Sequence, residues 1–322
     1  MNVLEFEHTL NSWGKEHIPF FFLIDFEMEK PVVWRASQVP SKFLFSIGEF
    51  TSTESQSKNL GIVDLIKLPI PFADYKSKFD LVKQRIAFGD SYLTNLTVKT
   101  KIELNQPLNE LFHKTQAKYK ICWDEKFLCF SPETFVKIID GKIFSFPMKG
   151  TIDASLPDAE RIILADQKEL SEHVTIVDLI RNDLSSVSSN VVVKRFRYVE
   201  EIMTNEKSLL QVSSEICGDL PDDFYSKLGS IMVSLLPAGS ISGAPKNKTL
   251  EIIREAEQEK RGYYTGVVGY FDGNTLDSGV MIRFIEQDSN QFYYRSGGGI
   301  TSQSLAQNEY QEVIDKIYVP VH

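Results

Sequence analysis

The sequence predicts an α+β fold built on antiparallel or mixed β-sheets. Apolar and polar residues alternate in many short stretches, which is typical of half-buried strands. Two pairs of these stretches are joined by the dipeptides Asp140-Gly141 and Asp272-Gly273. Asp-Gly is a strong signal for a two-residue hairpin turn. Longer segments with helical spacing lie between the hairpins, and this mixture argues against a doubly wound parallel sheet.

The first third of the chain combines short strands with one long helix. Phe79, Val82 and Ile86 recur at helical spacing, and Gly89 follows as a terminator. The polar stretch Thr51–Asn59 is expected to be a loop and is the best candidate for a mobile segment. The expected elements are strands 20–25, 31–34, 44–50 and 91–104 and a helix over 72–87.

The middle third contains a long apolar stripe at helical spacing between residues 159 and 184, which predicts a helix that faces the core. The final third is richer in glycine and contains further strand patterns. The expected strands are 119–130, 135–139, 142–146, 191–198, 208–217, 267–271, 278–286 and 291–296. The expected helices are 108–117, 159–184, 222–236, 248–259 and 304–317.

Composition limits the possible partners and compartments. The 322 residues are 42% hydrophobic and 25% charged, as in an ordinary globular protein, and the net charge of -9 argues against nucleic acid or an anionic membrane as partner. Cys122, Cys129 and Cys217 form no CxxC motif, which favours a reducing, cytoplasmic setting. The N-terminus lacks the pattern of a signal peptide. The apolar run 18–24 is too short to span a membrane.

A lysine stands in an unusual setting in Pro147-Met-Lys-Gly-Thr151, directly after an apolar alternating run. Proline fixes the entry torsion, and glycine permits a close approach or a positive φ. Lys149 is therefore held rather than freely mobile, although a surface lysine in a turn is the simpler interpretation. Because the 135–139 and 142–146 strands form a hairpin, Glu133 and Lys149 are expected to come close in space.

Two helical carboxylate pairs have the same form. Glu169 and Glu172 are three residues apart, as are Glu309 and Glu312, so each pair shares one helix face. A solvated acidic face is the common explanation for one such pair alone. If both faces converge, they form an oxygen-only site suited to a hard cation such as Mg²⁺. The histidines and cysteines have no zinc spacing.

Three segments are suited to hold anions. Ser240-Ile-Ser-Gly-Ala-Pro-Lys246 opens a helix, where free N–H groups favour negative charge, but it lacks the ending of a Walker phosphate loop. Gly297-Gly-Gly299 follows a strand and can present backbone amides. Arg283 is a charge in an apolar strand pattern, where either an anionic partner or an exposed strand face explains it.

The order of these motifs resembles the chorismate-utilising enzymes, which include component I of anthranilate synthase and of aminodeoxychorismate synthase and the isochorismate and salicylate synthases. The resemblance covers roughly residue 75 to the C-terminus, with residues 1–74 as a shortened N-terminal part of the same domain. It rests on Ser131-Pro-Glu-Thr-Phe135, Pro147-Met-Lys-Gly-Thr151, Glu172-His-Val-Thr-Ile-Val-Asp-Leu-Ile-Arg-Asn-Asp183, Ser242-Gly-Ala-Pro-Lys246, Arg261-Gly-Tyr-Tyr-Thr-Gly266, Ile282-Arg283, Gly297-Gly-Gly299 and Glu309-Tyr-Gln-Glu312. The implied fold is a sandwich of two antiparallel sheets with outer helices.

The lysine before Gly-Thr distinguishes the implied activity, because relatives that make anthranilate, isochorismate or salicylate usually carry alanine there. The resemblance therefore implies synthesis of 4-amino-4-deoxychorismate for 4-aminobenzoate and folate. Lys149 would attack C2 of chorismate while Glu133 protonates the leaving 4-hydroxyl group, and ammonia from a glutamine amidotransferase partner would then add at C4 and expel the lysine.

The resemblance also implies the remaining site residues. The Mg²⁺ ligands map to Glu172 and Glu312, with Glu169 and Glu309 as close supports. The substrate contacts map to Gly150, Thr151, Gln211, Ser240, Gly243, Lys246, Tyr264, Arg283, Gly298 and Gly299. Gln211 stands where many relatives have histidine, which leaves a hydrogen-bonding role but no acid–base role. The Leu-Leu-Glu-Ser element of the tryptophan pocket is absent from the shortened N-terminal part.

Two other functions are compatible with the motifs. Anthranilate synthase component I, or another chorismate enzyme, would use the same substrate. A non-catalytic paralogue that binds a glutaminase would keep the fold without the reaction. The presence together of Glu133, Lys149, Glu172 and Glu312 argues against the second.

Overall fold

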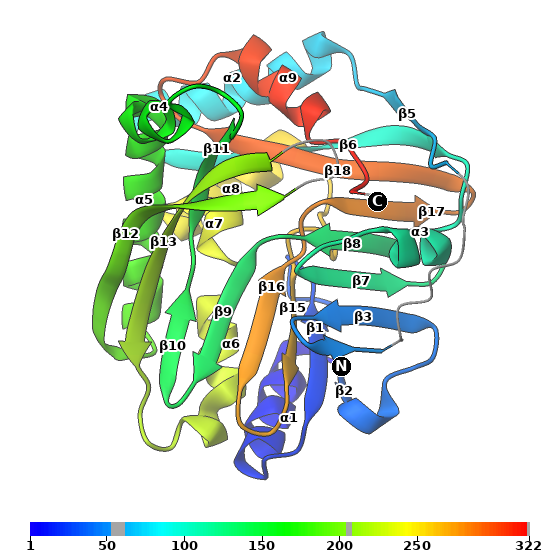
Figure 1. Ribbon diagram of the computed structural model, residues 1–322, viewed down its shortest axis with the longest axis vertical. Helices are drawn as coiled ribbons and strands as arrows, with labels where there is room; N and C mark the ends of the chain where they lie inside the picture. Colours follow the sequence, from blue (N-terminus) through cyan, green and yellow to red (C-terminus); the bar gives the residue numbers. More distant parts are fainter. Residues whose placement is uncertain (53–61, 204–207, 321–322) are drawn as a thin grey trace.

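Two antiparallel β-sheets form the centre of the molecule in the computed structural model, which describes residues 1–52, 62–203 and 208–320 (Figure 1). Within these residues each sheet has nine strands. Sheet A runs through β11 (Met148–Asp153), β13 (Ser208–Asp219), β10 (Lys142–Ser145), β9 (Thr134–Ile139), β16 (Leu276–Val280), β15 (Val267–Phe271), β1 (Phe20–Ile24) and β2 (Val32–Arg35), with β12 (Ser189–Met203) paired to β13. Sheet B runs through β14 (Gly243–Ala244), β6 (Leu93–Leu104), β18 (Gln291–Ile300), β17 (Phe284–Asp288), β8 (Phe127–Ser131), β7 (Tyr119–Trp123), β3 (Phe43–Ile47) and β4 (Phe50–Thr51), with β5 (Leu65–Leu68) paired to β6.

Helices cover the outer faces of the sheets (Figure 1). They are α1 (Val3–Lys15), α2 (Phe72–Phe88), α3 (Leu108–Lys114), α4 (Ala159–Ala165), α5 (Gln167–Ser185), α6 (Leu228–Leu235), α7 (Gly239–Ser242), α8 (Lys246–Glu257) and α9 (Ala306–Asp315). Apolar residues of α1, α5 and α6 pack against sheet A, whereas α2, α8 and α9 pack against β6 and β18 of sheet B. None of these helices in the described part of the chain is long and apolar enough to cross a membrane.

Strand β1 shows how the sandwich is held together. All five of its residues are buried. Phe20 and Phe22 face the helices that cover sheet A, whereas Phe21 faces sheet B and contacts Phe43 and Phe45 with ring centroids 5.0 and 4.8 Å apart. Because both faces of the strand are covered, its sequence is continuously apolar rather than alternating. The predicted α+β sandwich is confirmed.

Three predicted elements are divided in the structure. The strand expected over 119–130 is the hairpin of β7 and β8, with Glu125 at φ +60° in its turn. The helix expected over 159–184 is broken at Asp166, whose side chain caps α5 by accepting from the backbone N–H of Glu169. The strand expected over 278–286 is also two strands, β16 in sheet A and β17 in sheet B.

Other differences are smaller. The chain crosses between the sheets at Arg283, which has φ +53° and lies in the connection rather than in a strand. Helix α1 was not expected, although Asn2 and Glu5 form a capping box at its start. Strand β11 forms where the sequence predicts a turn. Of the predicted loop at Thr51–Asn59, residues 53–59 lie outside the described residues.

Candidate active site

Lys149 lies in a bulge of β11. The pairing of β11 with β13 shifts register between Met148 and Thr151, so β11 has one extra residue and Lys149 and Gly150 together oppose Val212. Gly150 takes φ +81°, which glycine reaches without steric cost. A Cβ atom at Gly150 would lie 3.2 Å from Oε2 of Glu169. The glycine expected from the sequence thus has a positive φ, and it lets the strand approach the first turn of α5.

The side chain of Lys149 is directed toward α5. Its Nζ atom lies 3.8 Å from Oε2 of Glu172, and the two side chains are 22% and 10% exposed. Their attraction is therefore less screened than that of a surface pair. The simpler interpretation of Lys149 as a surface lysine is wrong.

A groove of about 780 Å³ is lined by Glu172 of this ion pair. One wall is the outer face of α5, which includes Glu172 and Asp178. The other wall contains Tyr92, Pro245 and the segment 301–303. The volume lies in the range of small-molecule sites, so a substrate of that size can reach Glu172 from solvent.

The second carboxylate pair approaches the glycine segment of β18. Oε1 of Glu312 and Oε2 of Glu309 lie 3.5 and 3.6 Å from the place of a Cβ atom at Gly298. Nζ of Lys149 lies 3.5 Å from the corresponding place at Gly299. Successive residues of a strand point to opposite faces. Because neither glycine has a side chain, the carboxylates and the amine can both approach the backbone of this strand.

The four glutamates provide only oxygen donors, which suits Mg²⁺ better than zinc. In the described residues, no three histidine, cysteine, aspartate or glutamate side chains are grouped closely enough to hold a metal. Mg²⁺ keeps several waters and needs only one or two protein carboxylates. The donor chemistry of the glutamates suits Mg²⁺, and a cation held jointly by Glu172 and Glu312 stays a prediction.

Glu133 precedes β9 and is held by α7. Its Oε1 atom accepts a short hydrogen bond from the hydroxyl group of Ser240. Burial raises the pKa of Glu133, and this effect outweighs the hydrogen bond from Ser240 and the positive charges of Lys149, Arg283 and Lys316, which lower it. The structure thus brings Glu133 into the electrostatic neighbourhood of Lys149, as the hairpin predicted.

Arg283 and Lys316 add positive charge on the same side. Arg283 donates from Nε to the hydroxyl oxygen of Tyr318 at 3.2 Å. Lys316 donates to Oε1 of Glu312 at 2.6 Å and to the carbonyl oxygen of Gly297 at 2.8 Å. Burial lowers the pKa of Lys316, although Glu312 opposes the shift. Lys316 was missed in the sequence, where its position four residues after Glu312 was the available signal.

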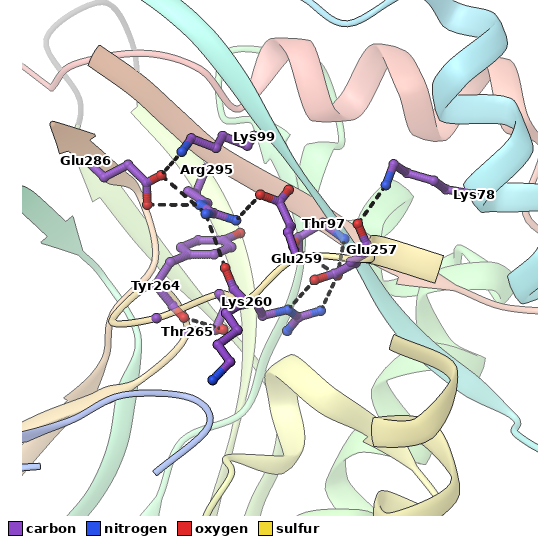
Figure 2. Close-up of polar contacts among 12 residues, drawn as sticks. Lys78, Thr97, Lys99, Glu257, Glu259, Lys260, Tyr264, Thr265, Glu286 and Arg295 are labelled. Carbon is purple, nitrogen blue, oxygen red and sulfur yellow. Dashed lines mark hydrogen bonds and ion pairs between the residues drawn. The ribbon is translucent and has the colours of Figure 1, made fainter. Parts of the chain in front are cut away.

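Tyr264 is buried beside an ionic network (Figure 2). Burial raises its pKa to about 12. In Figure 2, Arg295 lies between Glu286 and Glu259, with Tyr264 next to it. Nearby, Arg261 pairs with Glu257 at 2.6 Å, and both side chains are 1% exposed. The Arg-Gly-Tyr-Tyr-Thr-Gly motif is therefore anchored by its arginine, which fixes the position of the tyrosine.

The remaining predicted residues are placed as follows. Gly243 has φ +130°, and a Cβ atom there would lie 1.9 Å from the carbonyl oxygen of Leu93, so only glycine permits β14 to pair with β6. Gln211 is the register partner of Thr151 beside the bulge of β11.

Lys246 begins α8 and donates to Asp183 at 2.8 Å and to a backbone carbonyl. Its partner here is a protein carboxylate, and its role toward a substrate stays a prediction.

His173 is a further residue that the sequence reasoning missed. It follows Glu172 directly, is buried, and its Nε2 atom lies 2.6 Å from the hydroxyl oxygen of Ser214 on β13. Burial, with the charges of Arg197 and Lys149, lowers its pKa to about 4. A neutral histidine thus fixes α5 to sheet A next to Glu172. Its adjacency to Glu172 in the sequence was the only signal.

Comparison with known proteins gives relatives over the whole chain. Residues 25–322 match the family model described as chorismate binding enzyme. An "Uncharacterized PabA-like protein" of Haemophilus influenzae is 49% identical over 98% of this chain and 96% of its own length. Aminodeoxychorismate synthase component 1 of Bacillus subtilis is 30% identical over 88% of this chain and 62% of its own length.

A solved structure of anthranilate synthase component I from Streptococcus pneumoniae aligns with a TM-score of 0.65 and 26% identity. The alignment covers 80% of this chain and 59% of that chain, so the chain spans about three fifths of the length of these two longer relatives. The family match includes the lysine bulge, both carboxylate pairs and the glycine segment described above. The chain belongs to the family of chorismate binding enzymes.

Proposed function

We propose that the chain is component I of an aminodeoxychorismate synthase, which converts chorismate and ammonia into 4-amino-4-deoxychorismate and water. The observation that carries this proposal is Lys149, whose amine lies between Glu172 and Gly299 and within electrostatic reach of Glu133. The Bacillus subtilis relative supports it, because its printed name states this activity.

Glu133 and Lys149 divide the chemistry in this proposal. The nitrogen of Lys149 forms a bond to C2 of chorismate as the C4–O bond breaks, and Glu133 gives its proton to the leaving hydroxyl group, which departs as water. Ammonia then forms a bond to C4, and the bond between C2 and the lysine nitrogen breaks. A raised pKa of Glu133 fits this role, because the residue must enter the reaction protonated.

The carboxylates and cations would position the substrate. Glu172 and Glu312, supported by Glu169 and Glu309, would hold Mg²⁺, which when bound supplies positive charge for a substrate carboxylate. Arg283 and Lys316 lie near Glu133 and can attract a second carboxylate. A glutamine amidotransferase partner would supply the ammonia.

The test is an assay of the purified chain with chorismate, Mg²⁺ and an ammonium salt, with and without an added aminodeoxychorismate lyase. We expect chorismate to be consumed in both reactions and 4-aminobenzoate to form only with the lyase. Fluorescent anthranilate and pyruvate without lyase would instead identify an anthranilate synthase. No Mg²⁺-dependent chorismate binding in calorimetry would favour the non-catalytic paralogue.

Two variants separate the lysine from the rest of the site. Lys149→Ala should suppress product formation, because no other amine replaces the bond to C2. Lys142→Ala is the matched control, since Lys142 lies on β10 of the same sheet and pairs with Asp219 at the surface. Undiminished product from Lys149→Ala would remove the lysine from the mechanism. Replacing ammonium with glutamine should stop turnover unless the partner is added.

A further inference from the structure

A small cavity lies behind Glu133, separate from the groove that leads to Glu172. Its volume is about 30 Å³, and it lies between β9, β10, α5, α6 and α7. Glu133, Asp183, Ser145 and Ser240 contribute polar groups, and most of the other lining residues are apolar. Lys149 and the four glutamates of the predicted cation site do not line it.

The cavity has the size and the polar partners that water requires. A space of this volume accommodates one or two water molecules, and a buried water usually makes two to four hydrogen bonds. Two carboxyl groups and two hydroxyl groups face it. The hydroxyl group of Ser240 already donates to Glu133, and that of Ser145 donates to the carbonyl oxygen of Phe135 at 3.1 Å. Water here has acceptors at both carboxyl groups.

Asp183 is partly exposed to solvent. The side chain of Asp183 is 18% exposed, and that of its partner Lys246 is 17% exposed. Burial raises the pKa of Asp183 despite the nearby lysine. Asp183 therefore reaches both the cavity and the solvent, and it can hold a proton more readily than a surface aspartate can.

We propose that water in this cavity joins Glu133 to Asp183 and forms the path by which Glu133 regains its proton from solvent. The inference rests on the proposed function, in which Glu133 gives its proton to the leaving hydroxyl group. The carboxylate of Glu133 then takes a proton from the cavity water, the water takes one from Asp183, and Asp183 takes one from solvent. A proton released from the nitrogen that was ammonia balances the one taken up.

Two substitutions interrupt this path in different ways. Asp183→Asn keeps the shape of the side chain and removes the exchangeable proton. Gly239→Ala adds a methyl group whose Cβ would lie 3.0 Å from Oδ2 of Asp183, and it occupies part of the cavity. The matched control is Asp277→Asn, because Asp277 is 16% exposed and pairs with Lys137 at 2.7 Å on the same sheet.

The kinetic readout is chorismate consumption in H₂O and in D₂O. For Asp183→Asn we expect kcat to fall about tenfold, less than the 10²–10⁴-fold effect of losing a general acid itself. The KM for chorismate should stay near the wild-type value, and the solvent isotope effect on kcat should rise because proton return becomes limiting. Asp277→Asn should keep the wild-type kcat and isotope effect. An unchanged kcat in Asp183→Asn, or equal losses in it and the control, overturns the proposal.

A high-resolution crystal structure separates this inference from the proposed function, because it needs no turnover. We expect ordered water between Glu133 and Asp183 in the wild-type protein and its loss in Gly239→Ala. A dry cavity in the wild-type protein overturns the proton path even if the enzyme makes aminodeoxychorismate. If the wild-type protein consumes no chorismate, the proposed function fails, and the proton path fails with it whatever the cavity holds.

Discussion

Removing the hydroxyl group of Ser240 should make Glu133 a weaker acid. The hydroxyl group donates to Oε1 of Glu133, which stabilises the charged carboxylate and lowers its pKa. In Ser240→Ala only the cations Lys149, Arg283 and Lys316 still oppose the effect of burial. The pKa of Glu133 should therefore rise further above its ordinary value.

The size of the shift follows from the strength of the bond. A hydrogen bond to a charged group contributes about 1.5–3 kcal/mol, and one pKa unit corresponds to about 1.4 kcal/mol. Because water can replace part of the lost bond, we expect the charged carboxylate of Glu133 to lose the lower end of this range, about 1.5 kcal/mol of stabilisation. Ser242→Ala is the matched control, since the hydroxyl group of Ser242 lies on the same helix and donates to the carbonyl oxygen of Ala238 at 3.0 Å.

The assay is the pH dependence of chorismate consumption. In the proposed function Glu133 acts as an acid, so activity should fall as pH rises through its pKa, and this limb should move to higher pH in Ser240→Ala. The free energy of unfolding should also fall as pH rises. A carboxyl group whose pKa is raised on folding stabilises the fold fully at pH values below the pKa of the unfolded state. This contribution is lost as pH rises through the pKa of the folded state. Urea unfolding across that pH range should show the loss at higher pH in the variant. A limb that stays in place, or moves to lower pH, would refute the reasoning.

Two further predictions concern the scaffold of the site and use urea unfolding. Glu257→Gln leaves Arg261 buried without its ionic partner and should lower the free energy of unfolding by about 3–5 kcal/mol, whereas Lys260→Ala, which removes an exposed pair, should leave it unchanged. Gly243→Ala should cost more than Gly262→Ala: both have positive φ, but a Cβ at Gly243 meets a carbonyl oxygen at 1.9 Å and one at Gly262 meets nothing within 4 Å. If Glu257→Gln and Lys260→Ala lowered the free energy of unfolding equally, the argument from the buried ion pair would be contradicted. An equal loss in Gly243→Ala and Gly262→Ala would contradict the argument from the close carbonyl oxygen.

Local patterns predicted most of the fold because hairpins and amphipathic helices carry their own signals. Asp140-Gly141 joins β9 to β10, and the stripe after Asp166 faces the core in α5. The crossing at Arg283 carried no such signal. Both sheets bury apolar residues, so the pattern continues from β16 into β17 although the backbone leaves one sheet and enters the other.

The candidate site was predictable in its residue types and less so in its pairings. Glu309 and Glu312 approach Gly298, and Lys149 approaches Gly299, whereas the convergence of the two carboxylate pairs stays a prediction. Lys246 was expected to meet an anion and does so, but the structure provides Asp183 as that anion. Pairings of this kind depend on contacts between residues far apart in the chain. Helical spacing and turn residues do not specify such contacts.

The positions of Glu133 and Lys149 explain how one site can hold an acid and a nucleophile together. Glu133 borders the small cavity behind α7, and burial raises its pKa more than three nearby cations lower it. Lys149 lies against the carboxylate of Glu172, which lines the open groove. The two groups thus contact different helices, α7 through Ser240 for Glu133 and α5 through Glu172 for Lys149. The bulge in β11 is what allows Lys149 to reach toward α5, so the geometry of one strand decides whether the two groups can act on the same substrate.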